Sequence, residues 1–157
     1  MAYDRKANNA ALNSISANLS NGYFGNLTKK TITFTGSGTG TGSGGQTTIV
    51  ANVIGPILAS IVAIGKTDLT DNGSITLGTT GSSAGIIGAT VGSGITAGEI
   101  WHDTAPDSKF EETSVTKKYL LNDNITITVS TTGEGIATGA IDFYILWAPI
   151  SRTGDVN

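Results

Sequence analysis

Apolar and polar residues alternate along several segments of the chain after residue 30. Thr31–Thr35 (TITFT) and Asn124–Ser130 (NITITVS) place an apolar residue at every second position. Ala140–Trp147 (AIDFYILW) does the same, with Phe143 and Trp147 on one face. Because successive side chains of a β-strand point to opposite faces, this period of two predicts strands with one buried face.

The other face of Ala140–Trp147 carries Asp142, Tyr144 and Leu146, a mixture that could meet solvent or another subunit. Further segments have strand character, and turn residues rich in Gly and Asn separate them. These segments are Gln46–Ile54, Ile57–Gly65, Ser74–Leu77 and Val115–Leu121. Roughly eight short strands without alternating βαβ units predict an all-β fold, an antiparallel β-sandwich or barrel.

One apolar run, Ile49–Gly65 (IVANVIGPILASIVAIG), requires a membrane test. A spanning helix needs about 20 apolar residues, and this run is shorter. It also contains Pro56, which breaks helices, and it is dense in β-branched residues. We therefore expect two buried strands that meet at Gly55–Pro56, and no membrane partner.

The N-terminal region differs from the remainder, because it is rich in Asn and Ala. Leu12, Ile15 and Leu19 would share one face of a helix. We predict an N-terminal arm or short helix over residues 1–28, with a disordered tail as the alternative. Residues 29–157 are predicted to form a single β-domain, with an exposed, flexible Gly-rich loop at 36–45 (GSGTGTGSGG).

The amino-acid composition and net charge of the chain exclude several classes of protein. The chain has 157 residues, 22 of them Gly, no Cys and only 13% charged residues, so it is neither a disulfide scaffold nor a coiled coil. The formal net charge is −3, and the basic residues occur in scattered pairs such as Lys29–Lys30. Nucleic-acid binding normally requires a basic stripe, so we expect no nucleic-acid partner. Residues 1–6 show no apolar segment typical of a signal peptide.

Gly81–Gly85 (GSSAG) matches the G-x-S-x-G nucleophile pattern, with Ser83 at the nucleophile position. The only histidine is His102, and Glu99 or Asp103 could act as the acid. The pattern works on a strand–turn–helix, and no helix is predicted after Ser83. We therefore expect no enzymatic activity.

Metal binding is also not favoured. Glu99, His102, Asp103 and Asp107 surround Trp101, but their spacing is not diagnostic of a metal site. A polar loop with Trp101 packed inward is the simpler interpretation. An EF-hand counted from Asp68 would need Glu at its twelfth position, where Thr79 stands. We expect no cofactor.

Three segments in the second half of the chain form a recognisable pattern: Ser74–Thr90 (SITLGTTGSSAGIIGAT), Glu99–Asp103 and Asn124–Ser151. The last segment runs from a strand containing Ile127–Thr131 (ITVST), through Ala137–Gly139, to Phe143–Ser151 (FYILWAPIS). Together these segments resemble small virion proteins of tailed bacteriophages, in particular the capsid decoration proteins.

This resemblance implies a structural virion protein that binds the outside of a capsid and cements it, without catalysis. It would be made in the host cytoplasm, bind the major capsid protein and form a homo-oligomer, with a homotrimer favoured. Residues 1–28 are the expected contact with the shell or a neighbouring protomer. The apolar anchors there would be Tyr3, Leu12, Ile15, Leu19, Tyr23 and Phe24.

A binding module on a head fibre or tail, recognising a host surface glycan, is the alternative. Such a module would present exposed aromatic side chains in loops. Outside the predicted strands, the candidates are Trp101 and the aromatic residues Tyr3, Tyr23, Phe24 and Phe110.

Overall fold

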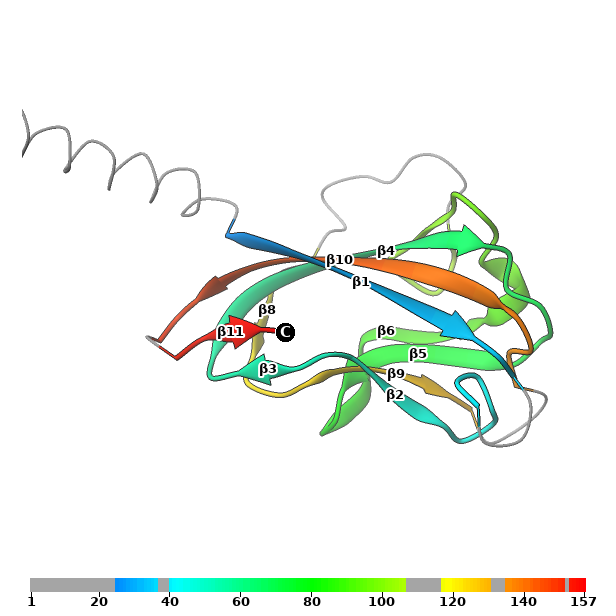
Figure 1. Ribbon diagram of the computed structural model, residues 1–157, viewed down its shortest axis with the longest axis horizontal. Coiled ribbons are helices and arrows are strands. Elements are labelled where there is room, and N and C mark those ends of the chain that lie inside the picture. The colour runs from blue at the N-terminus through cyan, green and yellow to red at the C-terminus, as the bar shows by residue number, and fades with distance from the viewer. Residues whose placement is uncertain (1–24, 37–39, 107–116, 131–134, 152) are drawn as a thin grey trace, which may run out of the picture.

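The computed structural model describes residues 25–36, 40–106, 117–130, 135–151 and 153–157 (Figure 1). Nearly all regular structure in these ranges is β-strand. The elements are β1 (Asn26–Phe34), β2 (Thr47–Ala51), β3 (Val53–Ile54), β4 (Ile57–Thr67), β5 (Ser74–Thr79), β6 (Ser82–Val91), the 3-10 turn η1 (Gly92–Gly94), β7 (Ile100–Trp101), β8 (Tyr119–Leu121), β9 (Ile125–Val129), β10 (Gly139–Pro149) and β11 (Asp155–Val156). The all-β prediction is confirmed.

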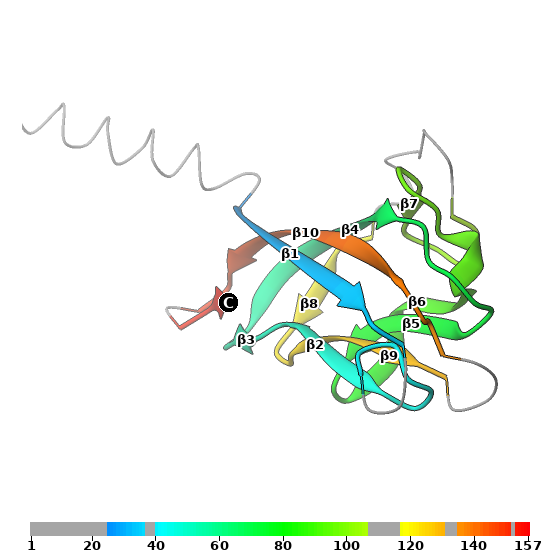
Figure 2. The same ribbon diagram turned by 45° about the vertical axis from the view of Figure 1, so that its right-hand side comes forward.

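Two antiparallel sheets form the two layers of a sandwich (Figures 1 and 2). In the first, here the β10 sheet, the order is β1-β10-β4, and both β7 and β8 pair with the far edge of β4. In the second, here the β9 sheet, the order is β2-β9-β5-β6. A short two-stranded sheet of β3 and β11 closes one end.

The core lies between the two sheets, and alternate residues of the long strands β4 and β10 fill much of it. Trp147 of β10 lies opposite Ala59 of β4, and Phe143 lies opposite Ala63. Each bulky ring therefore has a small residue beside it in the same row of the sheet, which lets the layer pack without voids. Burial of each large side chain in this core stabilises the fold by about 1.5–3 kcal/mol.

The β9 sheet supplies the opposite wall of the core. Its inward side chains, such as Ile75, Ile125 and Val129, are almost completely buried. They alternate with threonines, of which Thr76 and Thr128 are partly exposed and Thr126 is buried. Side chains from this sheet and the β10 sheet belong to one continuous apolar cluster.

The apolar run Ile49–Gly65 forms strands on both sides of Gly55–Pro56, as predicted. Gly55 has φ +70°, a conformation that L-residues rarely adopt, and the chain turns there between β3 and β4. This turn carries the chain from β2 in one sheet to β4 in the other. Within the described residues, no helix is long and apolar enough to cross a membrane.

The Gly-rich segment 36–45, predicted to be an exposed loop, is exposed at Gly44 and Gly45 but not along its whole described part. Gly42 and Ser43 are buried, and the Gly42 carbonyl accepts a hydrogen bond from the Ile136 amide at 2.7 Å. The amide of Thr35 donates to the Thr41 carbonyl at 2.8 Å, which closes a turn after β1. Residues 37–39 lie outside the described ranges.

Some element boundaries also differ from the predictions. Strand β1 begins at Asn26, so residues 26–28 belong to the β-domain and pair with β10. Strand β6 was not predicted, because Ser82–Gly85 and Gly88 interrupt its apolar alternation. Of the predicted segment Val115–Leu121, strand β8 covers Tyr119–Leu121, and residues 115 and 116 lie outside the described ranges.

The two ends of the described domain lie together. The Thr28 hydroxyl near the start of β1 is 3.5 Å from the carbonyl oxygen of Val156 in β11. The indole Nε1 of Trp147 donates a hydrogen bond to the same hydroxyl oxygen at 3.0 Å. The chain therefore enters and leaves the sandwich at the same end (Figure 1).

Replacing Gly42 by Ala should destabilise the fold. The residue has φ +106°, and a Cβ there would lie 2.3 Å from the Ile136 carbonyl oxygen. We expect the free energy of unfolding to fall by about 1–3 kcal/mol in urea titrations. Gly94→Ala is the control, because a Cβ there meets nothing within 4 Å, and should change stability by less than about 0.5 kcal/mol. Equal effects of the two substitutions would contradict a tightly packed turn at Gly42.

Candidate interaction surface

The outer side of the β10 sheet, which faces away from the core, exposes apolar side chains. The strand register places Leu27 beside Leu146, Tyr144 beside Val62, and Leu58 beside Leu120. Relative exposure is 63% for Leu27, 42% for Leu58 and 72% for Leu120. We call these six residues, which come from β1, β10, β4 and β8, the outer apolar face.

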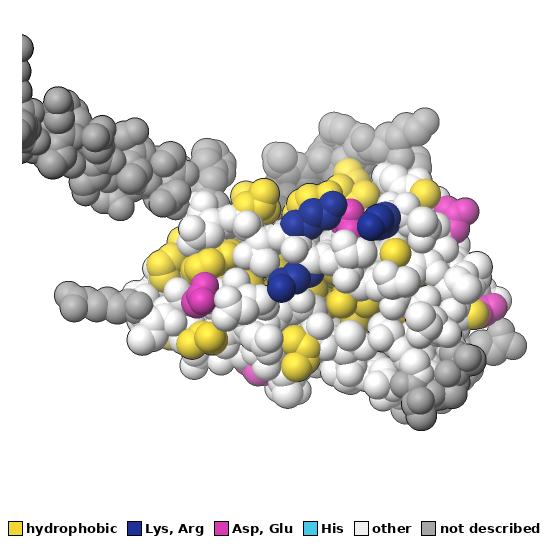
Figure 3. Space-filling model, in the orientation of Figure 1, with side chains coloured by type: hydrophobic (Ala, Val, Ile, Leu, Met, Phe, Trp, Pro, Cys, Tyr) yellow, Lys and Arg dark blue, Asp and Glu magenta, His cyan; other side chains and the backbone are white. Residues whose placement is uncertain are grey.

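This face arises from the same alternation that builds the core. On β10, Ile145 and Trp147 point inward, so Tyr144 and Leu146 point outward. On β4, Ile57, Ala59 and Ile61 are buried, and the residues between them face the outside. Figure 3 shows apolar side chains along the rim of the molecule formed by β1, β10 and β4.

Charged groups lie next to the outer apolar face. The Lys29 ammonium is 2.6 Å from an Asp142 carboxylate oxygen and 5.1 Å from the centre of the Tyr144 ring. The Thr31 hydroxyl donates to the other carboxylate oxygen of Asp142. The hydrogen bonds from Lys29 and then Thr31 lower the pKa of Asp142, and the hydrogen bond to Asp142 raises the pKa of Lys29. The Asp142 carboxylate, although nearly buried, is therefore charged and paired.

The predicted interface anchors cannot be compared with this surface. Tyr3, Leu12, Ile15, Leu19, Tyr23 and Phe24 all lie outside the described residues. Among the predicted features, the second face of Ala140–Trp147 is the one that the described fold places on this surface, through Tyr144 and Leu146. Sequence reasoning missed Leu27, Leu58 and Leu120, because their positions become neighbours only through the pairing of β1, β4 and β8.

Trp101, the candidate aromatic for glycan binding, is fully buried. Its indole Nε1 donates a hydrogen bond to the Thr90 hydroxyl at 2.9 Å, and its ring meets Phe143 edge-on at 6.4 Å between ring centres. The inward packing predicted for Trp101 is confirmed. The glycan-binding alternative thereby loses its candidate within the described part of the chain.

Ser83 and His102 lie at different places in the fold. Ser83 is near the start of β6, which is a strand and not the turn before a helix. Trp101 and Asp103 flank His102 and both lie near the Thr90 hydroxyl at the other end of β6. Seven residues of strand separate Ser83 from Thr90, which is about 23 Å at 3.3 Å per residue. The described residues do not bring a Ser83–His102 pair together.

The candidate metal ligands are likewise dispersed. The Glu99 carboxylate accepts a hydrogen bond from the Thr96 amide at 2.7 Å, and the Asp103 carboxylate accepts one from the Ala105 amide at 2.6 Å. Both carboxylates therefore close local turns. Across the described ranges, no three His, Cys, Asp or Glu side chains are grouped as metal ligands would be, and Asp107 lies outside those ranges.

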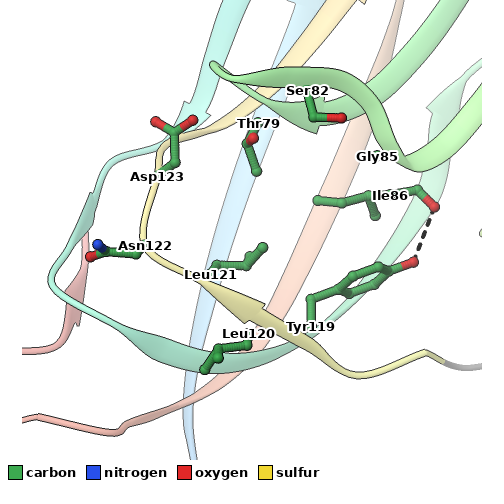
Figure 4. Close-up of a pocket in the computed structure, with 9 residues that line it drawn as sticks. All are labelled: Thr79, Ser82, Gly85, Ile86, Tyr119, Leu120, Leu121, Asn122 and Asp123. Atoms are coloured by element: carbon green, nitrogen blue, oxygen red, sulfur yellow. Dashed lines mark hydrogen bonds between the residues drawn. The ribbon is translucent and has the colours of Figure 1, made fainter.

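An open pocket of about 380 Å³ lies between the β5–β6 hairpin and the β8–β9 segment (Figure 4). Its wall is largely apolar, and the Tyr119 hydroxyl donates to the Ile86 carbonyl at 3.0 Å across it. The Asp123 carboxylate on its rim accepts the Gly81 amide at 2.7 Å, which lowers the pKa of Asp123. This carboxylate holds the hairpin in place. The pocket also borders Leu120 of the outer apolar face.

No model of a known protein family, no curated protein and no solved structure matches this chain.

Replacing Thr90 by Val should destabilise the core without changing its volume greatly. The substitution removes the acceptor of the buried Trp101 Nε1–H and leaves that donor without its partner. We expect a loss of about 1–3 kcal/mol in the free energy of unfolding, measured by chemical denaturation. Thr47→Val serves as the control, because the Thr47 hydroxyl pairs with Thr128 on the exposed surface. A loss no greater than that of the control would mean that the indole hydrogen bond adds nothing to stability.

Removing the Lys29 ammonium should weaken the pH dependence of stability in acid. The lowered pKa of Asp142 means that the folded state binds its proton less readily than the unfolded state, so stability is lost as the pH falls towards that lowered pKa. Lys29→Gln should therefore reduce the difference in urea midpoint between about pH 7 and pH 3. Lys30→Gln, one residue along β1, should leave that difference unchanged. The same response in both variants would rule out the Lys29–Asp142 pair as the cause.

Proposed function

We propose that this chain is a structural virion protein that binds the outside of a bacteriophage capsid and reinforces it, without catalysis. The observation that carries the proposal is the exposed apolar surface of a domain whose core is already complete. On the outer apolar face, Leu27, Leu58 and Leu120 are between 42% and 72% exposed. Large apolar areas on a soluble domain are typical of surfaces that another protein covers.

The resemblance to capsid decoration proteins supports the same proposal. Its last segment, Asn124–Ser151, contains β9 and β10. These are central strands of the two sheets, so the segment that resembles the family also organises this fold.

We infer that the partners are the major capsid protein and further copies of this chain, with a homotrimer as the favoured assembly. The protein would act on the capsid surface after synthesis in the host cytoplasm. Residues 1–28 would make the shell contact, because an arm can add backbone hydrogen bonds or apolar side chains to a neighbour. Strand β1 begins at Asn26, so the arm proper would precede it.

Co-sedimentation with phage heads tests the proposal. Purified full-length protein should sediment with undecorated heads of the phage that encodes it, and a variant that lacks residues 1–24 should remain in the supernatant. Circular dichroism should show the same β-spectrum for both proteins, since the described domain begins at residue 25. Failure of the full-length protein to bind heads would refute capsid decoration. Full binding by the shortened chain would refute the role of the arm alone.

A further inference from the structure

We infer that the outer apolar face is the surface through which copies of this chain pack against one another. The inference deepens the proposed assembly function and rests on it for biological context, but its physical argument concerns this domain alone. Three of its six residues, Leu27, Leu58 and Leu120, are exposed. The other three are half-buried: Val62, Tyr144 and Leu146.

The size of this side of the sheet suits a stable protein interface. Strands β4 and β10 are each 11 residues long, which corresponds to about 36 Å. Strand β1 adds 9 residues, and β7 and β8 at the far edge add only 2 and 3. At about 3.3 Å along a strand and about 4.8 Å between strands, this side therefore measures about 570 Å². Two copies that cover it would bury about 1,100 Å², above the roughly 1,000 Å² that a specific interface needs.

The charges on this side are compatible with burial against an identical surface. Asp142 is already neutralised by Lys29 and hydrogen-bonded by Thr31, so covering it leaves no unpaired carboxylate. Lys66 near the end of β4 is also exposed, and its charge acts on Asp142 as well. The six residues of the outer apolar face themselves carry no charge. An apolar surface is therefore the match for them, and a second copy of this chain supplies one.

Sheet geometry supports the same occupant. Two β-sheets pack face to face at about 10 Å when both present apolar residues at alternate positions. On β10, Tyr144 and Leu146 occupy consecutive outward positions, and on β4 the outward Leu58 and Val62 flank Ser60. Contact between copies would thus repeat the packing that already joins the two sheets within one chain.

Light scattering coupled to gel filtration tests the inference on the full-length chain. The wild-type protein should have at least twice the chain mass of 15.9 kDa. The double variant Leu27→Ser, Leu120→Ser should raise the dissociation constant by at least about tenfold and become monomeric at the same concentration. The matched control is Ile49→Ser, Val91→Ser, which removes two side chains of 50% and 51% exposure from the β9 sheet. This control should stay oligomeric.

Several outcomes would overturn the inference. They are a monomeric wild-type protein, equal behaviour of the two double variants, or an oligomer that survives loss of the leucines but not loss of residues 1–24. The last result would identify the N-terminal segment as the occupant. Thermal melting of both double variants shows whether they remain folded, so that unfolding is not mistaken for dissociation.

The head-binding assay separates this inference from the proposed function. A wild-type monomer that still sediments with heads would refute self-association through this face and leave capsid decoration standing. An oligomer that depends on Leu27 and Leu120 but never binds heads would refute capsid decoration and leave self-association through this face standing.

Discussion

The pairing of β4 with β10 is the constraint on which the rest of the structure depends. These two strands are long and lie side by side, and each bulky aromatic on the inner side of β10 has an alanine opposite it on β4. That match lets one layer hold Trp147 and Phe143 while the Ile-rich β9 sheet closes over them. Strands β1, β7 and β8 then add to its two edges.

The same pairing determines what the molecule presents to its surroundings. Because inward and outward residues alternate along β4 and along β10 after its register shift at Ala140–Ile141, an apolar residue at an outward position there is exposed unless another protein covers it. Polar residues occupy one part of this side, where Asp142 is held by Lys29 and Thr31. The other part is leucine-rich, so the sheet has both a self-contained ionic region and a region suited to protein contact.

Alternation in the sequence was enough to predict β9 and β10, since burial of one sheet face leaves a direct trace in the order of residues. The strands on either side of Gly55–Pro56 were predicted from their density of β-branched residues. Alternation failed for β6, because the first four residues of that strand, Ser82–Gly85, are exposed and Gly88 has no apolar side chain. It also failed at Gly42, because a glycine buried under Ile136 carries no apolar signal. The candidate surface was predictable only on β10. Its other members come from strands whose pairing depends on long-range topology, and the predicted arm residues lie outside the described chain.

The closeness of Thr28 to Val156 has a consequence for chain connectivity. Since β1 and β11 meet at one end of the sandwich, a short linker between them would give a circular permutant with the sheets unchanged. New termini could be opened at the exposed Thr80–Gly81 hairpin, which joins β5 to β6. The order in which the strands are synthesised could then be altered independently of the architecture that they build.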